Sequence, residues 1–172
     1  MNSPNHVLIT GCSSAGKTTL LDELWRRSLL TVGEPGRRVI AKGVDPITDL
    51  KGFIQEAEKL AVTDLQEAPP DALCFFDRGL LDALAAKERM GGPTLENSLG
   101  RGRPYRQSIF FADCWREIFT QDEGRQHSFD TARAESEHLK RRLPQLGYKL
   151  IYLPKAETEE RANFVLRELG LG

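Results

Sequence analysis

The 172-residue sequence lacks a long hydrophobic run and lacks an excess of charge of either sign. Its first ten residues, MNSPNHVLIT, contain no Lys or Arg and only one short apolar run, so we expect neither a signal peptide nor a membrane span there. We therefore expect a cytoplasmic protein without a membrane partner. The 24 Lys and Arg residues are balanced by 25 Asp and Glu residues. Such a balance gives no global field, so nucleic acid is not expected as a partner.

Cysteine and histidine are also scarce. The cysteines are Cys12, Cys74 and Cys114, and the histidines are His6, His127 and His138. The cysteines are far apart and odd in number, and no pair has the spacing of a zinc site or a redox motif, which favours a reducing, intracellular compartment. The histidines have no metal-ligand spacing, so we interpret them as structural or solvent-exposed.

Short apolar segments alternate with segments of helical periodicity along the chain, and no internal repeat is present. The pattern predicts strands at residues 7–9, 37–43, 72–76, 107–112 and 149–153. It predicts helices from about residue 17, with Leu20, Leu21, Leu24 and Trp25 on the apolar side, and at 47–68, 80–90, 129–145 and 157–169. Alternation of this kind indicates an α/β fold with a mostly parallel sheet, in one domain spanning residues 1–172.

The segment GCSSAGKT, residues 11–18, matches the pattern G-x-x-x-x-G-K-[ST] in full. Glycines let successive backbone N–H groups surround a phosphate, and the following helix adds the positive end of its dipole. Lys17 would then reach the β- and γ-phosphates, and the Thr18 hydroxyl would bind Mg²⁺. The alternative is a tight turn with an exposed lysine. The candidate nucleotide-binding residues here are Gly11, Cys12, Ser13, Ser14, Ala15, Gly16, Lys17, Thr18 and Thr19.

Asp77 ends the apolar segment ALCFFD. A carboxylate after a buried strand is typical of the aspartate that holds Mg²⁺ in proteins with a phosphate loop, and Asp77 could also orient an acceptor hydroxyl. The alternative is a helix N-cap, a position that Asp favours. We therefore expect Thr18 and Asp77 to be the metal-binding pair.

Arg78 follows Asp77, where many motor-type ATPases have a glutamate that polarises water. A guanidinium cannot act as a base, but it can bind an acceptor or a transferred phosphoryl group. The Asp-Arg pair therefore favours phosphoryl transfer over mechanical hydrolysis. A surface arginine or a plain Asp–Arg ion pair is the alternative.

Five stretches, in order, carry a resemblance to a known family: ITGCSSAGKTTLLDEL, GEPGRRVI, FFDRGLLDAL, WREIFTQDEGRQHSFDTA and LGYKLIYLPKAETEERANFVL. Together they span nearly the whole chain. They resemble small P-loop proteins described as predicted ATPases with an AAA-type domain, which are close to nucleoside and nucleotide kinases. The resemblance implies a three-layer P-loop NTPase fold whose five-stranded parallel sheet has the order 2-3-1-4-5. The sequence departs from AAA proteins in having no Asp-Glu pair and no evident sensor or arginine-finger module.

The resemblance also implies further site residues. A lid after the fourth strand would carry Arg116 and Arg125, with Arg125 the first candidate for catalysis, although both could be solvated charges. The loop after the fifth strand, with Lys155 and Ala156, would pack on adenine. The segment GEPGRR offers Glu34, Arg37 and Arg38 as acceptor contacts, or it could be an ordinary Pro-Gly turn.

These observations predict an ATP- and Mg²⁺-dependent phosphotransferase with Lys17, Asp77, Arg78 and Arg125 as catalytic residues. Its acceptor would be a small molecule, with nucleosides and nucleotides among the candidates. ATP is expected because no guanine-reading NKxD-like motif is present. The alternatives are a nucleotide-dependent switch that acts on a protein partner, and simple hydrolysis. The oligomeric state stays open.

Overall fold

Five parallel strands form the central sheet in the computed structural model, which describes residues 5–121 and 128–172. The strands are β1 (His6–Gly11), β2 (Leu30–Val32), β3 (Cys74–Asp77), β4 (Ser108–Ala112) and β5 (Lys149–Tyr152). Every neighbouring pair is parallel, and the order is β2-β3-β1-β4-β5. The predicted strand order is therefore confirmed.

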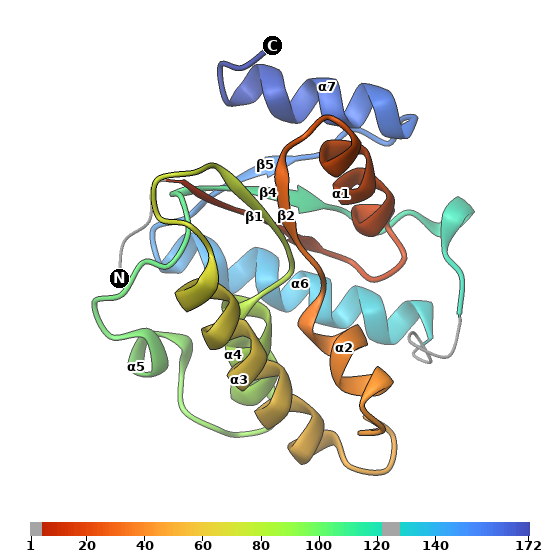
Figure 1. The fold of residues 1–172 in the computed structure, drawn as a ribbon. Coiled ribbons are helices and arrows are strands. Elements are labelled where there is room, and N and C mark those ends of the chain that lie inside the picture. Colours follow the sequence, from red (N-terminus) through yellow and green to blue (C-terminus); the bar gives the residue numbers. More distant parts are fainter. Residues whose placement is uncertain (1–4, 122–127) are drawn as a thin grey trace.

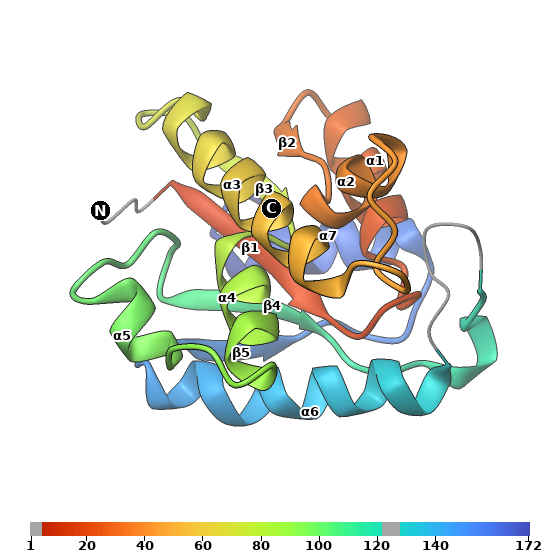
Figure 2. The ribbon, with the colours of Figure 1, turned by 90° about the horizontal axis from the view of Figure 1, so that it is seen from below.

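Helices cover both faces of the sheet. They are α1 (Lys17–Arg26), α2 (Pro35–Ala41), α3 (Leu50–Glu67), α4 (Leu80–Arg89), α5 (Leu95–Leu99), α6 (Phe129–Gln145) and α7 (Thr158–Glu168), with a 3₁₀ helix at Arg116–Ile118. Figure 1 shows α1 and α7 above the sheet and α4 and α6 below it. From below, α4 crosses in front of β1 and β4 (Figure 2). The result is the three-layer arrangement that an apolar parallel sheet requires.

The central strands are buried on both sides, which explains their continuous apolar sequence. Val7 and Ile9 of β1 pack in the cluster formed with α1 and α7, whereas Leu8 packs with α3, α4, α5 and α6. The same alternation places Phe75 on one side and Phe76 on the other. Both faces are covered, and in open sheets of this kind ligands bind beyond the carboxyl ends of the strands.

Two local predictions were wrong. The second strand lies at Leu30–Val32, and residues 37–43 fall largely in α2 instead. Pro35 explains this, because its fixed φ and missing N–H suit the first position of a helix. Trp25, expected on the apolar side of α1, is 67% exposed, whereas Leu20, Leu21 and Leu24 are buried.

Cys12 and Cys114 form a disulfide, with their Cα atoms 5.0 Å apart, while Cys74 is free and buried. The pattern of cysteines did not predict this pair, because 102 residues separate them and only the fold brings them together. The bridge joins the turn after β1 to the segment after β4. The spacing of the cysteines, which favoured a reducing compartment, thus gave no indication of this bridge.

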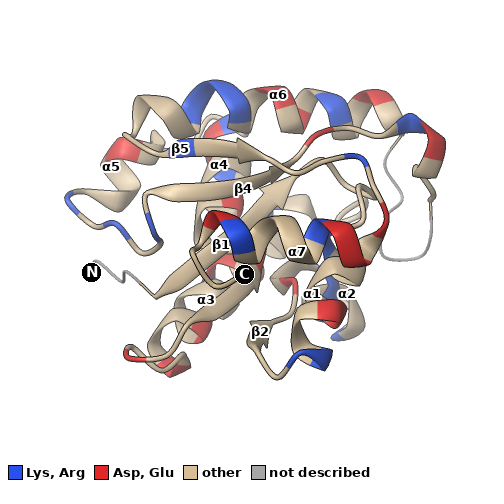
Figure 3. Ribbon diagram, turned by 90° about the horizontal axis from the view of Figure 1, so that it is seen from above, with Lys and Arg blue, Asp and Glu red and all other residues tan. Residues whose placement is uncertain are grey.

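Charges of both signs are spread over the molecule. Figure 3 shows basic and acidic residues mixed along α6 and α7. Within residues 5–121 and 128–172, no helix combines the length and apolar character needed to cross a membrane.

Candidate functional site

The turn between β1 and α1 forms a compact loop with two glycines in positive-φ conformations. Gly11 has φ 123°, and a Cβ there would lie 2.2 Å from the Ala112 carbonyl oxygen. Gly16 has φ 75°, and a Cβ there would meet the Arg161 guanidinium at 2.4 Å. The Cys12 N–H donates to the Ala112 carbonyl at 2.8 Å, which ties the loop to β4. Only glycine fits these two positions, so the spacing of the motif has a direct steric cause.

Two cationic side chains are buried against this loop. Lys17 begins α1, and its ammonium donates to the carbonyl oxygen of Cys12. Arg161 of α7 donates to the Ala15 carbonyl at 2.9 Å, and its Nε is buried without a hydrogen-bond partner among the described residues. Burial lowers the pKa of Arg161. Positive charge is therefore concentrated around a loop whose backbone suits an anion.

Thr18 and Asp77 meet at the carboxyl ends of β1 and β3. The Thr18 hydroxyl donates to Asp77 Oδ2 at 2.7 Å, and Asp77 Oδ1 is buried without a hydrogen-bond partner in the described part of the chain. A buried carboxylate oxygen without a partner beside a hydroxyl fits Mg²⁺, which takes few protein oxygens and completes its shell with water and phosphate. The described residues contain no group of three or more His, Cys, Asp or Glu side chains able to hold a metal.

The surroundings of Asp77 raise the pKa of its carboxyl group. Burial raises the pKa of Asp77 to about 6, and the negative charge of Glu34 acts in the same direction. Lys17, the hydrogen bond from Thr18 and Arg78 oppose this rise. An added cation would favour the charged carboxylate, because opposite charge lowers the pKa of an acid.

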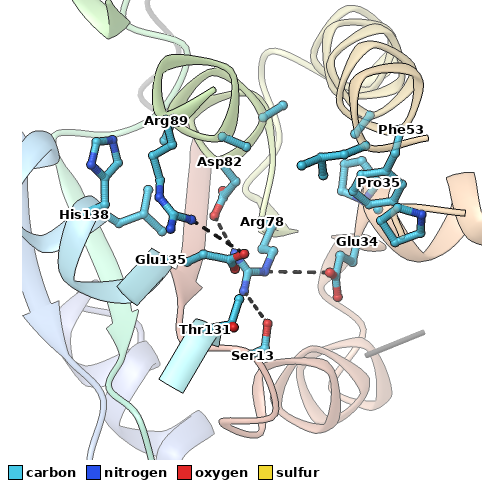
Figure 4. Close-up of a pocket in the computed structure, with 18 of the residues that line it drawn as sticks. Ser13, Glu34, Pro35, Phe53, Arg78, Asp82, Arg89, Thr131, Glu135 and His138 are labelled. Carbon is cyan, nitrogen blue, oxygen red and sulfur yellow. Dashed lines mark hydrogen bonds and ion pairs between the residues drawn. The ribbon is translucent and has the colours of Figure 1, made fainter. Parts of the chain in front are cut away.

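Arg78 lies at the centre of a set of contacts between the loop and the elements around it (Figure 4). Its guanidinium is 3.1 Å from Ser13 Oγ, 3.1 Å from Asp82 Oδ1 and 3.7 Å from Glu34 Oε1. Its backbone has φ 58°, an uncommon value for a residue other than glycine. Burial alone would lower the pKa of Arg78, but Asp82, Glu34 and other carboxylates outweigh it and raise the pKa. The side chain is only 14% exposed, so Arg78 is not a surface arginine.

A pocket of about 460 Å³ opens beside this arginine. Ser13, Glu34, Arg78 and Asp82 are among its lining residues, and Figure 4 shows Phe53 on the side of Glu34, across Arg78 from Arg89 and His138. Elements α2, α3, α4 and α6 all contribute lining residues. The arrangement can hold a molecule of small-substrate size next to a phosphate-binding loop.

The other residues considered for the acceptor separate into two groups. Glu34 lines the pocket. Arg37 does not line it, but the Nε of Arg37 lies 3.5 Å from Oε2 of Glu34. Arg38 forms a two-pronged ion pair with Asp64 of α3, which ties α2 to α3. A structural role therefore accounts for Arg38.

Of the candidate lid and adenine residues that the structure describes, none lines the pocket. Arg116 is exposed, with its guanidinium 3.9 Å from the centre of the Phe129 ring. Arg125 and His127 lie outside the described residues. Lys155 and Ala156 follow β5, and Lys155 is exposed.

Several residues of the site were not found from the sequence. Asp82 holds Arg78 from α4, and its i,i+4 spacing from Arg78 is a signal that could have indicated the pair. Glu135 and His138 line the pocket from α6, and Arg161 reaches the loop from α7. Nothing in the local sequence relates these three to residues 11–18, because only the packing of the sheet brings them together.

A phosphate loop after the central strand, with an aspartate ending the neighbouring strand, defines a P-loop protein of the kinase type. A family described as an AAA domain matches residues 6–161. The chain belongs to this family. A comparison of this chain with curated protein sequences found no match.

Solved structures of kinases share the fold. Deoxyadenosine kinase from M. mycoides with bound dATP has a TM-score of 0.70 and 10% identity, covering 96% of this chain and 99% of that one. Shikimate kinase from Acinetobacter baumannii, in complex with shikimate, has a TM-score of 0.64 and 14% identity, covering 96% and 92%. Thymidylate kinase from Ehrlichia chaffeensis has a TM-score of 0.58 and 17% identity, covering 96% and 100%. The kinase-like fold that the resemblance implied is confirmed.

Proposed function

We propose that this protein transfers the γ-phosphoryl group of ATP to a hydroxyl group of a small molecule bound in the pocket. The observation that carries the proposal is the position of Arg78. One guanidinium contacts Ser13 of the loop and approaches Glu34 of the pocket. An arginine that spans a triphosphate site and an acceptor site can neutralise charge on the phosphoryl group as it moves.

In this proposal the loop amides and Lys17 hold the triphosphate, and Lys155 and Ala156 lie near the adenine. Thr18 and Asp77 hold Mg²⁺, which would neutralise charge on the β- and γ-phosphates when bound. Their hydrogen bond supports this assignment, as does Asp77 Oδ1, which has no hydrogen-bond partner within residues 5–121 and 128–172. Little covalent chemistry is required of the protein, because positioning and electrostatics supply most of the catalysis.

The transfer itself is an in-line displacement. The acceptor oxygen bonds to the γ-phosphorus while the bond from that phosphorus to the β–γ bridging oxygen breaks, and ADP keeps the electron pair. We assign the hydroxyl proton to the carboxylate of Glu34, because Glu34 lines the pocket and Asp77 does not. The pocket also favours a kinase over a switch, since a switch needs no small-molecule acceptor site.

The direct test is incubation of the purified protein with labelled ATP, Mg²⁺ and a panel of nucleosides, cofactor precursors and antibiotics. We expect label to move to one acceptor class. Glu34→Gln should lower the transfer rate by about 10²–10⁴-fold while the Kd for ATP stays within about twofold. The matched control is Glu56→Gln, a surface residue paired with Lys59, which should leave the rate unchanged. Transfer to no acceptor, with hydrolysis unaffected by all of them, would contradict the proposal.

A further inference from the structure

The charges that line the pocket are unequal in number. Among the described lining residues, the carboxylates of Glu34, Asp82 and Glu135 face only two guanidinium groups, those of Arg78 and Arg89. Both arginines already have partners. Arg78 lies 3.1 Å from Asp82 and 3.7 Å from Glu34, and Arg89 lies 3.7 Å from Glu135 (Figure 4). The pocket therefore offers an anion no guanidinium that lacks a carboxylate neighbour.

The remaining titratable group of the lining does not restore positive charge. His138 has its Nε2 3.0 Å from the Glu88 carboxylate and its Nδ1 3.1 Å from the Arg141 guanidinium. Burial lowers the pKa of His138, with Arg141 and Arg89 acting in the same direction and Glu88 opposing them. A neutral imidazole is thus the expected form at neutral pH.

Part of the lining is apolar. It consists of Pro35 and Ile40 from α2, Ile47 from the connection to α3, and Leu50 and Phe53 from α3. Ile47 and Leu50 are 66% and 46% exposed. A flat or aliphatic group that covered these side chains would remove apolar surface from water, which is favourable.

From these two features we infer that the acceptor is an uncharged molecule that combines a hydroxyl group with an aromatic or aliphatic body. Acceptors that carry a phosphate or a carboxylate are excluded, since their charge would face an excess of carboxylates. The inference rests on the proposed function for the identity of the pocket as an acceptor site. It adds that the phosphorylated product, being an anion, is expelled by the same carboxylates that accept the neutral substrate.

The test compares matched pairs of compounds that differ in charge, by titration calorimetry without ATP. The probes are thymidine and thymidine 5′-monophosphate, deoxyadenosine and its 5′-monophosphate, and methyl shikimate and shikimate. In every pair that binds, the neutral member should bind at least about tenfold tighter than the anion. Equal or tighter binding of the anions, or no binding of any neutral member at millimolar concentration, would overturn the inference.

A variant that removes one carboxylate tests whether charge causes the preference for neutral compounds. Glu135→Gln leaves Arg89 without its carboxylate neighbour, so the preference for the neutral member of each pair should fall by about three- to tenfold. Glu137→Gln, on the same helix and paired with Lys140 instead, is the control and should keep the wild-type preference. An unchanged preference in Glu135→Gln would contradict the electrostatic explanation.

The binding and transfer measurements separate this inference from the proposed function. Neutral compounds that bind without receiving phosphate would leave the charge preference standing and remove the kinase activity. Phosphate transfer to an anionic acceptor would leave the kinase activity standing and contradict the charge preference.

Discussion

The Thr18 hydroxyl donates a 2.7 Å hydrogen bond to the Asp77 carboxylate across 59 residues of sequence. Parallel pairing of β1 with β3 brings the two together, because Ile9 stands in register with Asp77 at the strand ends.

Asp77→Asn should stabilise the protein without nucleotide while weakening its binding of Mg²⁺ and ATP. The pKa of Asp77 is raised in the folded state, so the folded protein binds the proton more tightly than the unfolded chain does. The charged carboxylate therefore costs stability above pH 6, and this cost disappears as the pH falls through about 6 towards 4. At pH 7.5 the variant should gain about 1–3 kcal/mol in the free energy of unfolding.

Urea unfolding at several pH values, with circular dichroism as the readout, measures this difference. Asp71→Asn, at an exposed position, should show no such gain. A gain in Asp77→Asn that is as large at pH 4 as at pH 7.5 would contradict the role of the raised pKa.

Lys17→Ala should abolish binding of ATP, because a buried ammonium beside the loop is lost. Titration calorimetry gives the Kd, and the exposed Lys59→Ala serves as the control. If the variant keeps a Kd within about threefold of the wild type, well under the roughly 1.4 kcal/mol of a tenfold change, Lys17 does not bind phosphate. Circular dichroism must show that the variant is folded.

Arg78→Gly and Arg78→Ala should lose transfer activity equally, by about 10²–10³-fold, but differ in stability. The positive φ of Arg78 suits glycine and strains alanine. The free energy of unfolding should therefore be about 1 kcal/mol higher for the glycine variant than for the alanine variant. Ser28, with φ 65°, allows the same pair of substitutions as a control for the backbone alone. There the stability difference should recur without any loss of activity. A more stable alanine variant at position 78 would argue against backbone strain.

Reduction by dithiothreitol should lower the free energy of unfolding by about 2–4 kcal/mol, because the bridge between Cys12 and Cys114 restricts the unfolded chain. Thiol titration in denaturant should find one free thiol, that of Cys74, before reduction and three afterwards. Cys114→Ser should make the stability insensitive to dithiothreitol. Three free thiols in the protein before reduction would show that the bridge is absent.

Much of the fold could be predicted from the sequence because its signals are local. Burial on both faces makes β1, β3 and β4 continuously apolar, and the glycines of residues 11–16 fix the turn between strand and helix. The second strand was misplaced, because Leu30–Val32 is short and half-exposed and so carries little apolar signal.

The site was only partly accessible from the sequence, for a physical reason. The relation of Lys17, Thr18 and Asp77 follows from a motif and a strand end, although their roles stay predictions. By contrast, Glu135 and Arg161 reach the site from helices more than a hundred residues along the chain from the loop. Side chains brought together only by the packing of distant helices have no common sequence pattern.

The contact between Arg161 and the Ala15 carbonyl also bears on how the protein is made. Synthesis proceeds from the N-terminus, so the loop at residues 11–18 leaves the ribosome long before α7. The two partners are 146 positions apart, a length that takes roughly 7 to 30 seconds to synthesise at about 5–20 residues per second. During that time the loop lacks the arginine that packs against Gly16. This contact of the loop can therefore form only after nearly the whole chain has been synthesised.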